Sequence, residues 1–278
     1  MPAPRFASVE SALHALTGLF AAHAREHILV VTGAGISLAS GIPTFRGQDP
    51  GAVWKKDVTE LGTFRYFSQD PVGSWRWYLS RFERTLGAKP NPAHLALVAL
   101  ESFCAHQGGE MLLVTQNIDG LHRQAGSRHL IEVHGRADRI RCPRQGCANG
   151  APAGSLPRTD FDLDAFLADP STSTLPRCPR CREVMRQHVL WFDEYYDSHR
   201  DYQWPRVLEA AASAEAVLFV GTSFSVGVTD LILRAALERD APVLSIDPAS
   251  VAPAQQVVSL QVRAEEILPA LCKRLGAV

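Results

Sequence analysis

The feature that most constrains the fold of this chain is a short apolar run that leads directly into a glycine-rich turn. Residues 28–31 form the run, and the stretch TGAGISLASGIPTFRG occupies residues 32–47. Such a run, bounded by glycine, predicts a buried strand followed by a tight turn and a short helix. Sheets that bind dinucleotides begin in this way. The spacing is nevertheless unusual, because Gly33 and Gly35 are followed by Leu38 where the usual fingerprint has its third glycine.

Short apolar runs then alternate with segments of helical periodicity along the rest of the chain. This alternation predicts an α/β fold, namely a Rossmann-like, doubly wound parallel sheet. The expected strands are residues 28–31, 111–115, 130–133, 217–220 and 242–246, and the expected helices are residues 9–25, 74–86, 91–103, 205–214, 228–239 and 264–275.

One region differs in composition and is expected to form a small insert. Residues 139–188 are rich in proline, arginine, glycine and serine, and apolar strands resume after them. We therefore expect a discontinuous Rossmann-like domain over residues 1–138 and 189–278, interrupted by an insert over residues 139–188. Residues 44–90 are rich in aromatic residues and broken by glycine and proline, which predicts a mixed segment of helices and loops.

Four of the six cysteines form two close pairs within this insert, Cys142-x4-Cys147 and Cys178-x2-Cys181. Four thiolates in two close pairs suit tetrahedral zinc, and they leave no open coordination position, so we expect one structural zinc ion. The alternative is two redox-active pairs. Zinc is favoured because a short polar insert needs a cross-link to stay folded.

Charge and hydropathy disfavour several classes of partner. The chain of 278 residues has a formal net charge of −1 at pH 7, so it lacks the basic excess that nucleic-acid binding requires. No apolar run reaches the length of a membrane span, and the N-terminal region shows helical spacing of leucines instead of a secretion signal. We expect a cytoplasmic enzyme without membrane or nucleic-acid partners, and the oligomeric state stays open.

Polar residues follow several of the predicted strands, where ligands bind in open parallel sheets. They occur in TQNIDGLH at residues 115–122, in EVHG at residues 132–135, in GTS at residues 221–223 and at Asp247. Each motif alone reads as an ordinary turn, and a lone histidine is more often packed than catalytic. Their convergence at several strand ends favours a binding site.

Taken in order, the motifs GAGIS-x2-SGIP-x-FRG, TQNID-x-LH, HG, the paired cysteines and GTS resemble the sirtuin family over roughly residues 22–275. The resemblance implies an NAD-dependent protein lysine deacylase that acts on acylated proteins and releases nicotinamide and O-acyl-ADP-ribose. In this family a histidine activates a ribose hydroxyl after nicotinamide has left. A mono-ADP-ribosyltransferase or NAD glycohydrolase on the same scaffold is the alternative, and a non-catalytic NAD sensor is disfavoured because the motifs are intact.

The resemblance also assigns roles to individual residues of this sequence. It assigns catalysis to His134, Asn117 and Asp119, and cofactor contacts to Gly33, Ala34, Gly35, Ser37, Phe45, Arg46, Gln116, Asn117, Ile118, Asp119, Gly221, Thr222, Ser223 and Asp247. Residues 188–194 correspond to the strand that pairs with the substrate peptide, with Val189, Leu190, Trp191 and Phe192 as substrate contacts.

Two features bear on the substrate. Tyr78 and Arg81 have the Tyr-x-x-Arg spacing of sirtuins that accept succinyl- or malonyl-lysine, and residues three apart share one helix face. A guanidinium with a phenol suits an acyl chain that ends in a carboxylate. Asp193 and Gln187 depart from the glycine and proline usual in the family, and the acidic Asp193 predicts a preference for basic residues beside the target lysine.

Overall fold

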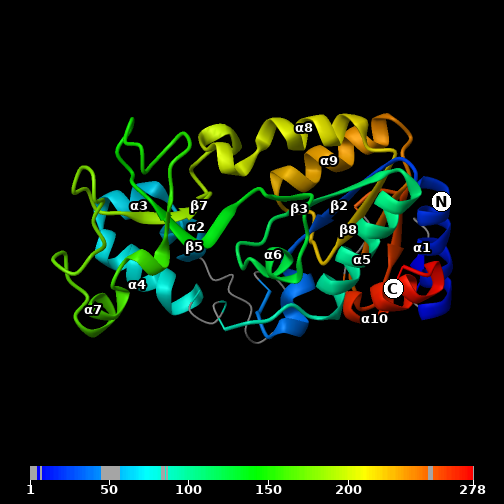
Figure 1. Cartoon of the computed structure of the whole chain (residues 1–278), viewed down its shortest axis with the longest axis horizontal. Coiled ribbons are helices and arrows are strands. Elements are labelled where there is room, and N and C mark those ends of the chain that lie inside the picture. The colour runs from blue at the N-terminus through cyan, green and yellow to red at the C-terminus, as the bar shows by residue number, and fades with distance from the viewer. Residues whose placement is uncertain are drawn as a thin grey trace.

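The computed structural model describes residues 5–6, 8–44, 57–82, 85, 87–249 and 253–277. A large parallel sheet with its covering helices forms one end of the elongated molecule, and a smaller module forms the other end (Figure 1). The expected α/β fold is confirmed. None of the helices in these ranges combines the length and the apolar character needed to cross a bilayer.

Seven parallel strands form the large sheet in the order β1-β10-β9-β8-β2-β3-β4. Their bounds are Arg5–Phe6 (β1), His27–Thr32 (β2), Glu110–Thr115 (β3), Leu130–Glu132 (β4), Ala216–Val220 (β8), Val243–Ile246 (β9) and Val257–Leu260 (β10). The sequence predicted five adjacent strands, β9, β8, β2, β3 and β4. It did not predict β1 and β10, which complete the sheet beyond β9.

Helices cover both faces of this sheet, as a doubly wound fold requires. The buried leucines of α1 (Val9–His23), α5 (Pro92–Gln107) and α10 (Ala264–Leu275) join one core cluster with alternate residues of the strands. Helices α8 (Trp204–Ser213) and α9 (Gly227–Glu238) pack on the opposite face. Alternate residues of β2 enter the two cores, since Val30 belongs to the first and Val31 to the second.

The smaller module is built on a three-stranded antiparallel sheet, in the order β6-β5-β7. Its strands are β5 (Gly135–Arg141), β6 (Leu156–Pro157) and β7 (Arg186–Val189), and its helices are η3 (Arg158–Asp160) and α7 (Leu163–Ala168). Helices α2 (Asp57–Leu61), α3 (Phe64–Gln69) and α4 (Pro71–Phe82) lie beside it. Trp75 of α4 is fully buried against Phe166 and donates its indole N–H to the carbonyl of Met185 at 2.9 Å. The limits of the domains remain a prediction.

A buried ion-pair cluster fixes the segment that follows β7. Glu194 accepts hydrogen bonds from Arg141 at 2.9 Å and from Arg186 at 2.5 Å, and both arginine side chains are almost fully buried. The guanidinium of Arg186 also stacks on the Trp191 ring, 3.4 Å from its centroid. Burial alone would raise the pKa of Glu194, but the two arginines lower it below its ordinary value.

We predict that Glu194→Gln lowers the free energy of unfolding by about 3–5 kcal/mol, because it leaves two buried guanidinium groups without a counter-charge. In the wild type, the Glu194 carboxylate stabilises the folded protein fully above its pKa in the unfolded chain, ~4.3. This stabilisation is lost as the pH falls through the lower pKa that Glu194 has in the folded protein. Denaturant midpoints of the two proteins at neutral pH measure the loss. Asp138→Asn is the control, since it removes an exposed ion pair with Arg136 and is expected to change stability little.

Candidate active site

The candidate site lies where five neighbouring strands end on one row of the sheet. Thr32, Thr115, Val220, Glu132 and Ile246 are the last residues of β2, β3, β8, β4 and β9, and each is paired in register with its neighbour. The polar motifs that follow these strands therefore emerge side by side at the same edge. This is the edge at which ligands bind in parallel sheets.

The glycine turn after β2 packs directly on the turn after β8. The N–H of Gly33 donates to the carbonyl of Val220 at 3.0 Å, and the N–H of Gly35 donates to that of Gly221 at 2.9 Å. A Cβ atom on Gly33 would lie 2.7 Å from Gly221 O, and one on Gly35 would lie 2.7 Å from Gly221 Cα. Gly221 itself has a φ of +60°. Side chains at these positions would force the two turns apart.

A short 3₁₀ helix, η1 (Ala34–Ser40), continues from this turn and places Ser37 among the polar residues after β3. The Ser37 hydroxyl donates to an oxygen of Asp119 at 2.7 Å, and the Asn117 amide donates to Ser37 Oγ and to the Gly33 carbonyl, both at 3.1 Å. Burial raises the pKa of Asp119, and the N–H of Leu121 and the Ser37 hydroxyl oppose this shift. The structure thus brings together residues assigned from two separate motifs.

A second layer of hydrogen bonds, which the sequence did not reveal, supports Asn117 from behind. The Thr32 hydroxyl donates to Thr115 Oγ1 at 2.8 Å, and the same oxygen accepts the N–H of Asn117 at 3.1 Å. The Nε2 atom of His122, in helix α6 (Leu121–Ala125), lies 2.9 Å from Thr32 Oγ1. These threonines end strands, so their only signal in the sequence was their position.

His134 follows β4 and is held in one tautomer. Its Nδ1–H donates to the carbonyl of Gln116 at 2.8 Å, so Nε2 carries the lone pair. The side chain keeps some exposure, yet its dense surroundings lower the pKa to about 4, against a smaller opposing effect of the Gln116 carbonyl. The Gln116 side chain in turn donates to the carbonyl of Thr32 and to the hydroxyl of Thr222, each at 3.2 Å. His134 is therefore neutral at neutral pH and tied to the polar network.

The other residues assigned to the cofactor lie around this network. Ala34 is the first residue of η1, and the carbonyl of Ile118 accepts the N–H of Ala137 at 2.9 Å. Ser223 is exposed and bonds Ser225, and Asp247 accepts the N–H of Ala249 at 2.8 Å just after β9. Phe45 and Arg46 lie outside the described residues.

The predicted substrate strand over residues 188–194 is wrong in its extent, because β7 ends at Val189. The next three N–H groups turn to other acceptors: those of Leu190, Trp191 and Phe192 donate to His134 O, Glu194 Oε2 and Gly62 O. Side-chain exposure also separates these residues, since Trp191 is 5 % exposed and Phe192 is 57 % exposed.

Asp193 has structural partners, and the preference for basic residues beside the target lysine expected from it stays a prediction. Its two carboxylate oxygens accept the N–H groups of Phe64 and Arg65 at 2.7 and 3.0 Å. These donors are the first residues of α3, where a carboxylate satisfies amides that have no partner within the helix. The acidic residue therefore anchors α3 to the segment after β7, which a glycine could not do. Gln187 is buried within β7, opposite Ile140.

The Tyr-x-x-Arg pair lies on α4 of the small module. Tyr78 is 2 % exposed within the third core cluster, and burial raises the pKa of its phenol. The guanidinium carbon of Arg81 lies 4.9 Å from the centroid of the Trp77 ring. A role of this pair in acyl recognition stays a prediction.

Four cysteines meet at the base of the small sheet in a geometry that fits one zinc ion. The Sγ atoms of Cys142 and Cys181 are 3.4 Å apart, those of Cys147 and Cys178 are 3.7 Å apart, and those of Cys147 and Cys181 are 3.9 Å apart. Tetrahedral zinc with Zn–S bonds of about 2.3 Å separates its sulfurs by about 3.8 Å. Burial opposes ionisation of Cys178, yet the N–H groups of Cys181 and Arg180 and the amide of Asn149 lower its pKa to about 6. The cluster therefore suits thiolate ligands.

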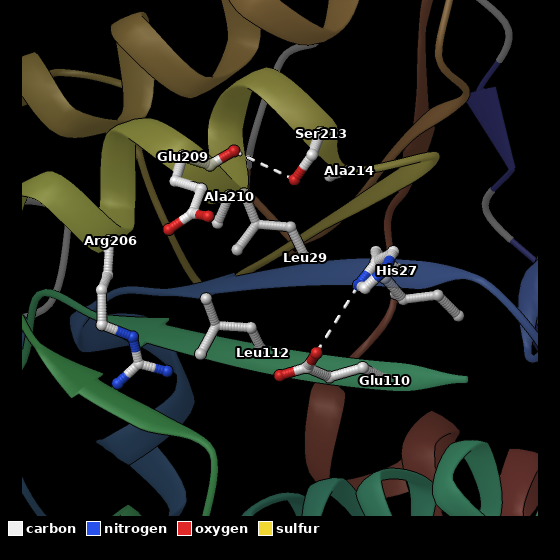
Figure 2. Close-up of a pocket in the computed structure, with 10 residues that line it drawn as sticks. His27, Leu29, Glu110, Leu112, Arg206, Glu209, Ala210, Ser213 and Ala214 are labelled. Carbon is white, nitrogen blue, oxygen red and sulfur yellow. Dashed lines mark hydrogen bonds and ion pairs between the residues drawn. The ribbon is translucent and has the colours of Figure 1, made fainter. Parts of the chain in front are cut away.

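A separate hollow of 260 Å³ lies at the opposite end of the strands. Figure 2 shows Leu29 and Leu112 between the charged residues Arg206, Glu110 and His27. His27 and Glu110 are the first residues of β2 and β3, whereas the network described above follows their last residues. This hollow is therefore not the candidate active site.

Comparisons with known proteins agree on one family. A model of the Sir2 family matches residues 33–228. NAD-dependent protein deacylase 2 of Pyrobaculum aerophilum is 36% identical over 253 residues, covering 90% of this chain and 91% of that protein. The NAD-dependent protein deacylase sirtuin-5, mitochondrial, of Danio rerio is 37% identical over 228 residues, or 78% and 72% of the two chains. A crystal structure described as a Sir2 homolog–NAD complex superposes with a TM-score of 0.76, at 29% identity, over 99% of this chain and 96% of that one.

We predict one zinc ion per chain, held by the four clustered cysteines. Cys147→Ser is expected to lose the metal and to melt the small module first, because the ion cross-links the two loops that carry the cysteine pairs. Elemental analysis measures the metal, and thermal unfolding monitors the module. Cys104→Ala, at a buried cysteine of α5 outside the cluster, is the control and is expected to keep its zinc.

Proposed function

Because the chain belongs to the Sir2 family, we infer that it is an NAD-dependent protein lysine deacylase that releases nicotinamide and O-acyl-ADP-ribose. The observation that carries this proposal is the convergence of three residues at the carboxyl edge of the sheet: Asn117 and Asp119, linked through Ser37, and His134, held by the Gln116 carbonyl. Acylated lysine side chains of proteins are the proposed substrates.

The residues at this edge fit a dinucleotide. The glycine turns after β2 and β8 meet at this edge backbone against backbone, with no side chain between them, and a glycine turn at such an edge is where dinucleotide-binding sheets hold the pyrophosphate. Ser37, Asn117 and Asp119 present hydroxyl, amide and carboxylate groups suited to the ribose and the nicotinamide amide. NAD, when bound, supplies an electrophilic C1′ carbon on its nicotinamide ribose.

His134 is the proposed general base. Its Nδ1–H is committed to the Gln116 carbonyl, so only Nε2 can accept a proton from a sugar hydroxyl. The low pKa keeps this nitrogen unprotonated at neutral pH. Transfer of ADP-ribose to another acceptor, or hydrolysis of NAD, would not require a base held so specifically. This arrangement therefore favours deacylation over the two alternative reactions.

The acyl group is the finer part of the proposal. Arg81 with Tyr78 would suit a succinyl or malonyl group, whose terminal carboxylate a guanidinium can pair. A cytoplasmic location stays a prediction from the sequence.

We predict that His134→Ala lowers the rate of deacylation by roughly 10²–10⁴-fold, because the sugar hydroxyl loses its base. The assay measures free nicotinamide and deacylated peptide separately for the wild type and the variant. His129→Ala, at an exposed histidine that pairs with Glu110 at the other end of β3, is the control. Release of nicotinamide by the wild type without any deacylated peptide would contradict the proposal and favour NAD hydrolysis.

We further predict that the wild type turns over a succinyl-lysine peptide faster than the matched acetyl-lysine peptide. Arg81→Met is expected to reduce succinyl turnover by at least tenfold and to leave acetyl turnover nearly unchanged, because it removes the cation and keeps an unbranched stem. Arg76→Met, at an exposed arginine of the same helix, is the matched control. If Arg81→Met reduces the turnover of both peptides equally, or of neither, Arg81 does not recognise the acyl group.

A further inference from the structure

Tyr196 lies against the proposed base, and no motif in the sequence marked it. It is the first residue of the 3₁₀ helix η4 (Tyr196–Ser198), which follows the segment after β7. Its hydroxyl oxygen lies 3.3 Å from Nε2 of His134, and the two rings are nearly parallel, at 24°, with centroids 5.8 Å apart. Two segments some sixty residues apart in sequence thus meet at the reactive nitrogen.

The direction of this hydrogen bond follows from the other bonds of the imidazole. Since Nδ1–H donates to the Gln116 carbonyl, Nε2 of the neutral ring has only a lone pair to offer. Tyr196 must therefore be the donor. Burial raises the pKa of the phenol, which keeps its proton in place, with a smaller opposing effect of the Val228 backbone amide.

The phenol is held in this place from two sides. Its ring stacks on Trp204 of α8 at 16°, with centroids 4.3 Å apart. On another side it meets the first turn of α9, where the backbone N–H of Val228 hydrogen-bonds its hydroxyl. Tyr196 therefore bridges the base, α8 and the start of the helix that follows the Gly221 turn.

Nε2 of the neutral imidazole has one lone pair. It can therefore accept a hydrogen bond from the Tyr196 hydroxyl or from the sugar hydroxyl of the nucleotide, but not from both at once. We propose that Tyr196 is a positioning residue for the base: in the free protein its hydroxyl holds Nε2 of His134, and it yields this place to the sugar hydroxyl when the nucleotide binds. This inference rests on the proposed function of His134. The hydrogen bond from Tyr196 keeps the His134 imidazole oriented and shields Nε2 from water. This bond must be broken before Nε2 can accept the sugar hydroxyl.

Tyr196→Phe tests the proposal, because it removes the hydroxyl and keeps the ring that stacks on Trp204. The first measurement is the ¹⁵N NMR spectrum of the His134 imidazole in the free protein as a function of pH. The Nε2 resonance is expected to move toward the value of an unbonded acceptor. The pKa of His134 is expected to rise, because a hydrogen bond to the neutral form has been lost. An unchanged resonance would overturn the proposal.

The second measurement uses ADP-ribose as the probe and the same resonance as the readout. ADP-ribose is expected to bind Tyr196→Phe about two- to tenfold more tightly than the wild type, since a typical hydrogen bond need not be broken first. kcat/KM for NAD in deacylation should rise by a similar factor. If Tyr196→Phe binds ADP-ribose equally tightly or more weakly than the wild type, the proposed exchange of the Tyr196 hydroxyl for the sugar hydroxyl is wrong.

Tyr195→Phe is the matched control, since it makes the same change at the neighbouring tyrosine, which is 78% exposed. It is expected to leave the His134 resonance and ADP-ribose binding unchanged. The NMR readout needs no turnover. Failure of the deacylase assignment would appear separately, as a wild type that deacylates no peptide while the effect of Tyr196→Phe on His134 persists.

Discussion

The close approach of two glycine turns is the constraint on which the rest of the site depends. The backbone of Gly33 and Gly35 bonds that of Val220 and Gly221, at distances that leave no space for a Cβ atom. This contact sets the position of η1 and therefore of Ser37, which reaches across to Asp119 after β3. The polar network exists because backbone, and not side chains, fills the space between the turns.

A second set of interactions joins the small module to the large sheet. Gly135, at the start of β5, has a φ of +79° and directly follows His134, so the base stands at the junction of the two parts. Leu190, just after β7, donates its N–H to the carbonyl of His134. The ion pairs of Glu194 with Arg141 and Arg186 then tie the following segment to β5 and β7. The stability of the module and the placement of the base are thus coupled through the backbone.

The segment after β7 combines structural and site roles in a few residues. Asp193 caps α3, Glu194 neutralises two buried arginines, and Tyr196 contacts the base. Residues so close in sequence can have different roles because Asp193 and Glu194 lie outside any helix or strand, and their side chains therefore face different neighbours. The same variety of neighbours also explains why the strand expected at residues 188–194 stops at Val189: the next three N–H groups donate to His134 O, Glu194 Oε2 and Gly62 O, which belong to different segments and not to one neighbouring strand.

Much of this architecture was determined by the sequence alone. The alternation of apolar runs and helical segments predicted five adjacent strands and the helices on both faces, because a strand buried on both faces is a short apolar run and a helix packed on a sheet repeats its apolar residues at helical spacing. The cysteine spacing predicted the metal cluster, since two close pairs of thiolates are the usual ligand set of a structural zinc ion. The register of the strand ends, the buried threonines behind Asn117 and the contact of Tyr196 with His134 were decided only by the tertiary structure. These features depend on distances between residues far apart in the chain, and a period or a spacing in the sequence does not encode such distances.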